Sequence, residues 1–249
     1  MHQRLSCLAA LGFLAVATSA RADLVIPTVD YPALTHQARS AEGFAPRGWK
    51  VETTVTGDLN GDGLPDLAIV LRENDPKNVI HNDGMGVDPF DTNPRILALA
   101  FARKDGGYDL AVENHLLIPR ATMPNLDDYL AEAGGVSIRK GALRVSLHLF
   151  SSAGGWSTGT TTYSFRWSSG GFHLVGYDNY DLERNTGETT DVSIDYLSGK
   201  MSTTTGNEGK KRPKVVWAKA PANPVTFERI GDGMGFDPQH PETPGAPDQ

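Results

Sequence analysis

Cysteine is nearly absent from this 249-residue chain, in which Cys7 is the only one. We expect Cys7 to be lost with an N-terminal leader, so that the remaining chain has no disulfides and no thiol chemistry. Long apolar runs are also lacking. The longest run, from Leu5 to Ala17, is shorter than the roughly 20 residues that span a bilayer. These two features argue against a disulfide-stapled scaffold and against a membrane-spanning protein.

The apolar run has the flanks of a secretory signal peptide. Arg4 gives it a short positive start, and Ala20-Arg21-Ala22 matches the A-x-A cleavage pattern. We therefore expect residues 1–22 to be a signal peptide and the mature protein to be periplasmic or extracellular. Export without cysteines fits a bacterial periplasm or cell exterior.

Basic residues are in the minority. Removing the leader removes Arg4 and Arg21, which leaves 21 basic against 30 acidic residues and a net charge of −9. This balance argues against nucleic acid and anionic lipid as partners and favours cations. The length suffices for a sizeable core in one large domain or two small ones.

Turn-forming residues and short alternating segments predict an all-β fold. The chain has 27 glycines and 16 prolines, as expected for many short strands. Successive hairpins predict an antiparallel meander, either sandwich-like or a partial propeller. The predicted strands are 49–56, 67–71, 96–101, 108–114, 136–138, 143–149, 160–167, 172–177, 192–196, 201–204, 214–218 and 225–230.

Two short helices are expected within this β-rich domain and its lead-in. One short helix is expected over residues 34–41. The other is expected over Pro124–Ala133, where Asn125 can cap the helix, Leu126, Tyr129 and Leu130 share a face, and Gly134 ends it. Residues 23–48 are expected to be a lead-in and 49–236 a single domain, with Phe44 and Trp49 as core anchors. The Pro-rich end, residues 237–249, is expected to be a disordered tail.

The stretch 57–67 carries the most specific chemical signal. Its polar side chains Asp58, Asn60, Asp62 and Asp66 fall at positions 1, 3, 5 and 9 of a loop, with glycines at 61 and 63 for a sharp turn. Ca²⁺ prefers six to eight oxygen ligands, and the carbonyl of Leu64 at position 7 is a natural fifth ligand beside these four. The sequence therefore predicts one calcium site.

Two features separate this loop from an EF-hand. Ile69 stands at position 12, where an EF-hand has a bidentate Glu, and the flanking segments read as strands rather than helices. The alternative is an Asx-rich turn that closes a hairpin without metal.

The loop resembles the calcium-binding loop of FG-GAP and VCBS-type repeats, which integrin-like propellers carry. Over residues 44–205, the chain also resembles a family of exported bacterial proteins that carry one such loop. Besides the loop, the segments that carry this resemblance are 48–49, 93–97, 154–156, 186–191 and 196–200. It implies export and a calcium-loop β fold but no activity. Propellers repeat the loop in several blades, whereas this chain has a single copy, which argues against a complete propeller.

A second motif occurs twice: Asp83-Gly84-Met85-Gly86-Val87-Asp88-Pro89 and Asp232-Gly233-Met234-Gly235-Phe236-Asp237-Pro238. The copies are interpreted as equivalent corners of a repeated fold, as loops that pack together, or as glycine turns with a buried Met. A second metal site through Asp83, Asp88 or Asp91 is the remaining alternative, although its spacing fits no known ligand pattern.

Signals for catalysis are weak. Gly155-Trp156-Ser157-Thr158-Gly159 matches the nucleophile elbow G-x-S-x-G, but a β-type segment follows it where a helix is required. The alternative is a glycine turn with Trp156 packed below it. No histidine pair has zinc-ligand spacing.

An acidic stretch leaves a glycosidase pair open, since paired acids need only be close in space. Its carboxylates are at 178, 181, 183, 188, 191 and 195, and Tyr177, Tyr180 and Tyr196 are candidates to line a carbohydrate groove. The preferred hypothesis is an exported calcium-binding β protein with a structural or binding role, for a protein or carbohydrate ligand. The alternative is a secreted hydrolase of glycans or esters.

Overall fold

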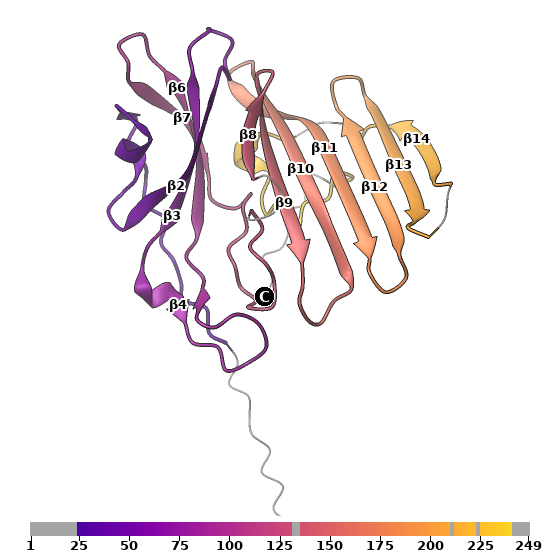
Figure 1. Ribbon diagram of the computed structural model, residues 1–249. Coiled ribbons are helices and arrows are strands. Elements are labelled where there is room, and N and C mark those ends of the chain that lie inside the picture. Colours follow the sequence, from indigo (N-terminus) through magenta and orange to yellow (C-terminus); the bar gives the residue numbers. More distant parts are fainter. Residues whose placement is uncertain (1–23, 131–134, 210–211, 223–224, 241–249) are drawn as a thin grey trace, which may run out of the picture.

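Two antiparallel sheets build the fold, as seen in a computed structural model that describes residues 24–130, 135–209, 212–222 and 225–240 (Figure 1). The five-stranded sheet has the order β1 (Gln37–Ala38), β7 (Tyr108–Asn114), β6 (Arg95–Ala102), β3 (Asp66–Glu73) and β2 (Trp49–Gly57). The seven-stranded sheet runs in sequence order and comprises β8 (Val136–Arg139), β9 (Ala142–Phe150), β10 (Ser157–Ser168), β11 (Gly171–Glu183), β12 (Glu188–Asp195), β13 (Lys200–Asn207) and β14 (Lys214–Lys219).

The seven-stranded sheet is a meander that curls into a half-barrel, and the five-stranded sheet packs at its β8 end (Figure 1). Turns join β8 to β9, β10 to β11 and β12 to β13, because alternating segments flanked by Gly, Asn and Ser favour hairpins. The prediction of an all-β fold is confirmed, and the arrangement is sandwich-like.

The main core lies between the two sheets. Leu143, Val145 and Leu147 alternate along β9 and point inward, where they meet Val70 of β3 and Leu97 of β6. Strands β3 and β6 are almost continuously apolar because both of their faces are buried.

A second core covers the opposite face of the five-stranded sheet. Ile69, Leu71 and Ile96 point into it, and the lead-in segment supplies Leu34 and Phe44 from the other side. The lead-in is therefore a covering layer. Phe44 is fully buried as predicted, and Trp49 packs at the margin of this core.

The C-terminal segment fills the concave face of the half-barrel. Phe236 packs its ring edge-on against Tyr163, with centroids 5.7 Å apart, and lies 5.8 Å from the ring of Tyr177. The hydroxyl of Tyr163 donates to the carbonyl of Gly233, which fixes the second copy of the repeated heptad in the core.

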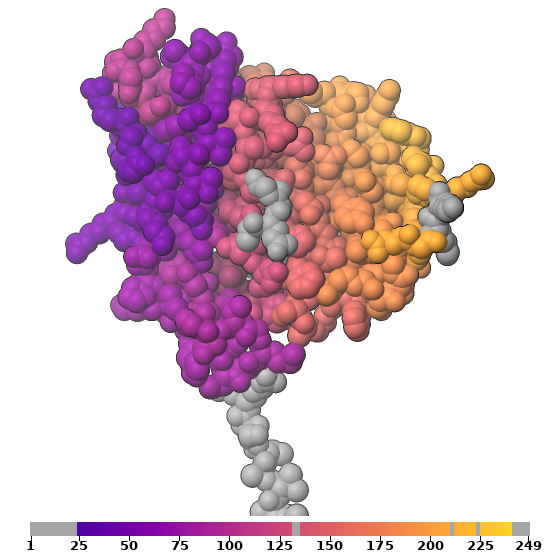
Figure 2. All heavy atoms as spheres, viewed as in Figure 1, coloured from indigo at the N-terminus to yellow at the C-terminus, as the bar shows by residue number. Residues whose placement is uncertain are grey.

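A small lobe hangs below the five-stranded sheet (Figures 1 and 2). It contains the two-stranded sheet of β4 (Val79–Ile80) and β5 (Phe90–Asp91). The guanidinium of Arg120 ties this lobe to the rest of the chain by donating to the carbonyl of Thr92, the side chain of Asn78 and the carbonyl of Pro27.

Both predicted helices are wrong. Residues 34–41 contain β1, followed by a 3-10 turn at Ala41–Phe44, because the edge of β7 offers hydrogen bonds to an extended segment. Within 124–133, the described part up to residue 130 is a turn region in which Leu126 bridges to Ser151. Residues 131–133 lie outside the described residues.

One strand prediction near the C-terminus also needs correction. The predicted strand 225–230 forms a single bridge, between Thr226 and His173, and then a 3-10 turn at Phe227–Arg229. The described start of the expected tail, residues 237–240, contains a turn in which Asp237 accepts hydrogen bonds from Gln239 and His240. The predicted signal peptide, residues 1–22, and residues 241–249 lie outside the described residues.

Among the residues described, the chain contains no helix long and apolar enough to cross a membrane.

Candidate functional site

The predicted calcium loop joins β2 and β3, as expected from the strand patterns on both sides of it. It lies beside the β8–β9 turn at the top of Figure 1. A Cβ placed on Gly57 would lie 2.6 Å from the side chain of Ile138, and one on Gly141 would lie 3.7 Å from the carbonyl of Asp58. Leu59, inside the loop, is buried in the main core. The loop therefore sits where the two sheets meet.

Asx turns shape the exposed half of this loop. The two carboxylate oxygens of Asp58 accept hydrogen bonds from the backbone of Gly61, at 2.7 Å, and Gly63, at 3.0 Å. Asn60 accepts from the backbone of Asp62, and Asp62 accepts from that of Leu64. Gly61 and Gly63 both have φ of 83°, a conformation that a side chain would strain.

Asp66 is placed differently from the other loop carboxylates because its side chain is fully buried. One oxygen accepts hydrogen bonds from the backbone of Leu59 and Asn60, and the other accepts from Ala102 at 2.8 Å, at the end of β6. Burial raises the pKa of Asp66, while these three N–H donors act in the opposite direction. Asp66 therefore ties the loop to two neighbouring strands.

The donor chemistry of the loop fits Ca²⁺, although the loop does not form a preassembled cage. Each carboxylate oxygen of Asp58 and Asp62 accepts one hydrogen bond and so keeps a lone pair for a cation. Within the described ranges, however, no group of three or more His, Cys, Asp or Glu side chains is gathered closely enough to hold a metal ion. Calcium binding would therefore require the loop carboxylates to draw together.

The two copies of the repeated heptad differ in structure. In the first copy, the second glycine, Gly86, lies so close to another backbone segment that an added Cβ would be 2.1 Å from the carbonyl of Pro124. Copy two packs through its first glycine, where a Cβ on Gly233 would lie 2.2 Å from the carbonyl of Leu117. Equivalent corners are therefore excluded. The interpretation as a turn with a buried Met is also wrong for copy one, because Met85 is 64% exposed.

The carboxylates of the first heptad contact a histidine. The ring of His81 lies 2.8 Å from Asp83 through Nε2 and 2.8 Å from Asp88 through Nδ1. The hydrogen bond to Asp88 and the nearby negative charge raise the pKa of His81. Asp91 instead contacts Arg72 at 3.1 Å, so the structure does not bring the three aspartates of this candidate second metal site together.

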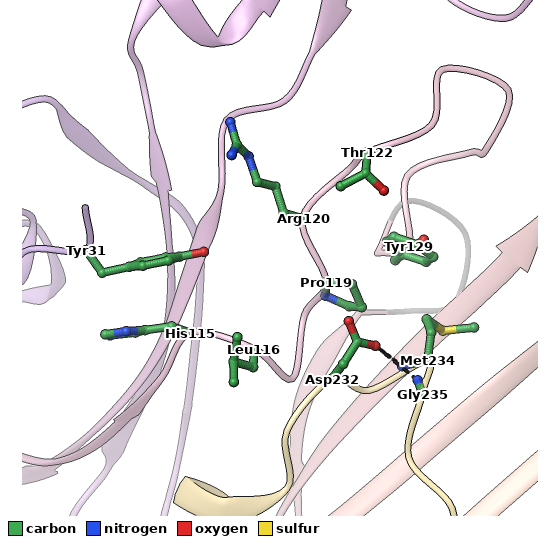
Figure 3. A pocket seen from close by; sticks show the side chains of 10 residues that line it. All are labelled: Tyr31, His115, Leu116, Pro119, Arg120, Thr122, Tyr129, Asp232, Met234 and Gly235. Atoms are coloured by element: carbon green, nitrogen blue, oxygen red, sulfur yellow. Dashed lines mark hydrogen bonds between the residues drawn. The ribbon is translucent and has the colours of Figure 1, made fainter. Parts of the chain in front are cut away.

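A pocket of about 260 Å³ is lined by loop residues of the lead-in, of 115–122, of the turn at Tyr129 and of the second heptad (Figure 3). Tyr31 stacks on His115 on one side, with ring centroids 4.6 Å apart, and Tyr129 lies on the other. Asp232 borders the floor and accepts hydrogen bonds from the backbone of Met234 and Gly235. Both hydrogen bonds of Asp232 are made within its own turn, so they explain the shape of the turn and do not indicate a ligand.

An ionic network around the buried Arg95 borders a second pocket, and nothing in the sequence indicated it. Arg95 is 8% exposed and donates two hydrogen bonds to Glu52 and two to Asp128, at 3.0 and 2.6 Å for the latter. Arg72 adds a contact to Glu52 at 3.2 Å. The partners lie 43 and 33 residues from Arg95 in sequence, so only the fold brings them together.

The G-x-S-x-G motif does not form a nucleophile elbow. Ser157 begins β10, a twelve-residue strand, and its hydroxyl donates to Asp181 at 2.7 Å. Arg184 holds the preceding turn through the carbonyls of Ser151 and Gly155. Trp156 is 61% exposed, so the expectation that it packs below the turn is also wrong.

The acidic stretch and its tyrosines are spread over both faces of the sheet. Tyr177 is buried in the core, whereas Tyr180 is exposed, so they do not line one groove with Tyr196. Glu183 and Glu188 are cross-strand partners, but both lie exposed at the end of a hairpin. Among the other acids, Asp178 accepts a hydrogen bond from Ser193, and Asp195 accepts two from the backbone of its turn.

Comparisons with known proteins leave the fold as the main guide to function: no protein-family model matches the chain, and no curated protein or solved structure matches it either.

Proposed function

We propose that this chain is an exported β protein whose 57–67 loop binds one Ca²⁺ ion, and that its role is structural or binding rather than catalytic. Asp58, Asn60, Asp62 and Asp66 would supply side-chain oxygens, and Leu64 a carbonyl. The bound ion would neutralise the loop carboxylates and stiffen the junction between the sheets.

The position of the loop is the observation that carries this proposal. Its carboxylates lie within nine residues, on a turn whose Leu59 enters the main core and whose backbone approaches the tip of the β8–β9 hairpin. An ion that closes this loop would therefore stabilise both sheets, since each packs against it.

Thermal unfolding with and without Ca²⁺ tests the proposal. At a free Ca²⁺ concentration one hundred times its dissociation constant, the ion would add about 2.7 kcal/mol to the free energy of unfolding. For a domain of this size, that corresponds to a rise of about 5–10 °C in the melting temperature. We expect Asp62→Ala to remove this rise, and Mg²⁺ to reproduce little of it.

Asp195→Ala is the matched control. Asp195 also accepts backbone hydrogen bonds in an exposed hairpin turn, but it lies in the β12–β13 turn. This variant should keep the full response to Ca²⁺. The proposal fails if wild-type protein melts at the same temperature in chelator and in Ca²⁺, or if Asp62→Ala keeps the shift.

A further inference from the structure

A groove on the outer face of the seven-stranded sheet is lined by four cations. It has a volume of about 390 Å³ and contains Arg139 and Lys140 at the β8–β9 turn, Arg144 of β9 and Arg166 of β10. Small residues form its floor, including Ser164 and Gly176, and no carboxylate lines it. We call this set of residues the basic groove.

Strand register explains why these cations gather. Ala142 of β9 pairs with Arg139 on one side and with Arg166 on the other. Since neighbouring strands lie about 4.8 Å apart, the backbones of the two arginines are separated by about 10 Å. Arg144 is two residues beyond Ala142 and so points to the same face, between Ser137 and Ser164.

Among the described residues, no carboxylate is paired with any of the four cations. Within the described part of the chain, none of them makes an ion pair or donates a side-chain hydrogen bond, whereas Arg72, Arg95 and Arg103 all contact carboxylates. This is unexpected in a chain in which acidic residues outnumber basic ones. Like charges this close repel one another unless an anion lies between them.

We propose that the basic groove binds a small polyanion that carries two or more phosphate or sulfate esters. Guanidinium groups donate paired hydrogen bonds that match the oxygens of such esters. The separation of Arg139 and Arg166 suits two ester groups better than one, with Arg144 between them. Leu197, 69% exposed at the rim, and Val175 offer apolar contacts to the carbon skeleton of the ligand.

Calorimetric titration of the full-length protein with two defined probes tests this site. Inositol hexakisphosphate supplies phosphate esters and sucrose octasulfate supplies sulfate esters, while inorganic phosphate and sucrose serve as the single-anion and uncharged comparisons. We expect at least one polyanion to bind, with an affinity that falls as salt rises, and inorganic phosphate to bind at least tenfold more weakly.

The decisive variant is Arg139→Ala/Arg166→Ala, because both side chains are exposed and their loss should leave the fold intact. We expect it to weaken polyanion binding at least tenfold. Arg47→Ala/Lys104→Ala removes the same charge from exposed positions elsewhere and should change the affinity less than twofold. If the first variant unfolds, Arg144→Ala, tested alone, should show the same direction of effect.

Three results would overturn the inference. The first is that neither polyanion binds at millimolar concentration. The second is that both double variants lose affinity equally, since net charge alone would then explain binding. The third is co-sedimentation with phosphatidylglycerol vesicles that depends on Arg139 and Arg166 while the soluble probes do not bind, because the groove would then recognise a membrane surface.

Discussion

Replacing Asp66 with alanine should destabilise the protein strongly, even in chelator. Its carboxylate is fully buried and accepts hydrogen bonds from the backbone N–H groups of Leu59, Asn60 and Ala102. Alanine would leave these donors without an acceptor at the point where the loop joins β3 and β6. The substitution thus tests whether Asp66 organises the loop independently of any metal.

The expected loss follows from the cost of unpaired buried donors, about 1–3 kcal/mol each. Leu59 is buried, whereas Asn60 and Ala102 are half-buried, so their unpaired donors would cost less than that of Leu59. We therefore expect Asp66→Ala to lower the free energy of unfolding by about 3–5 kcal/mol. Asp66→Asn should cost about 2 kcal/mol, because its amide nitrogen would face a backbone donor.

Urea denaturation in chelator at neutral pH measures these losses by linear extrapolation. Asp62→Ala is the comparison, since Asp62 is exposed and should cost about 1 kcal/mol or less without Ca²⁺. A loss below about 1 kcal/mol for Asp66→Ala, or equal losses for both variants, would refute this reasoning.

Three further predictions concern the rest of the fold. Arg95→Met removes the buried partner of Glu52 and Asp128, two carboxylates that keep some contact with water, and should cost about 1–3 kcal/mol in urea denaturation. Burial opposes ionisation of both acids, but Arg95 outweighs it and lowers the pKa of each below its ordinary value of 4.5 or 3.8. The ionised carboxylates therefore stabilise the fold above pH 4.5, and this stabilisation is lost as the pH falls below 3.8. The melting temperature of wild-type protein should fall over this pH range, and Arg95→Met should lack this part of the pH dependence. Gly233→Ala places a methyl group against the carbonyl of Leu117 and should cost about 1–3 kcal/mol in urea denaturation. Gly155→Ala is the control and should be nearly neutral in the same assay, because its Cβ would lie 3.8 Å from the nearest atom, in Ser151. Ser157→Ala removes one hydrogen bond to Asp181, so it should cost about 1 kcal/mol and leave p-nitrophenyl acetate hydrolysis unchanged; a large loss of turnover would revive the esterase hypothesis.

The hairpins were predictable because their signals are local. Alternation in Leu143–Leu149 and the turn at Lys140 and Gly141 specify β8–β9 without reference to the rest of the chain. The curl of the larger sheet and the way β6 joins β3 depend on contacts between distant segments. The covering role of the lead-in was missed for the same reason, since Leu34 meets Ile69 only in the folded chain.

Helix predictions failed where tertiary contacts outweigh local pattern. Leu126, Tyr129 and Leu130 have helical spacing, yet Asp128 is held by Arg95 and Leu126 bridges to Ser151, so the described part of the segment forms turns instead of a helix. Within the candidate site, the sequence identified the loop and its oxygens. It gave no sign that Asp66 is buried, because its partner at Ala102 lies 36 residues away.

Isothermal titration of the full-length protein with CaCl₂ tests the central claim most directly. We predict one Ca²⁺ per chain, with a dissociation constant of about 10⁻⁴–10⁻³ M, as is common for extracellular sites. Binding should be lost in Asp62→Ala and retained in Asp195→Ala. The absence of binding to wild-type protein, or equal binding to Asp62→Ala, would contradict a calcium site in the 57–67 loop.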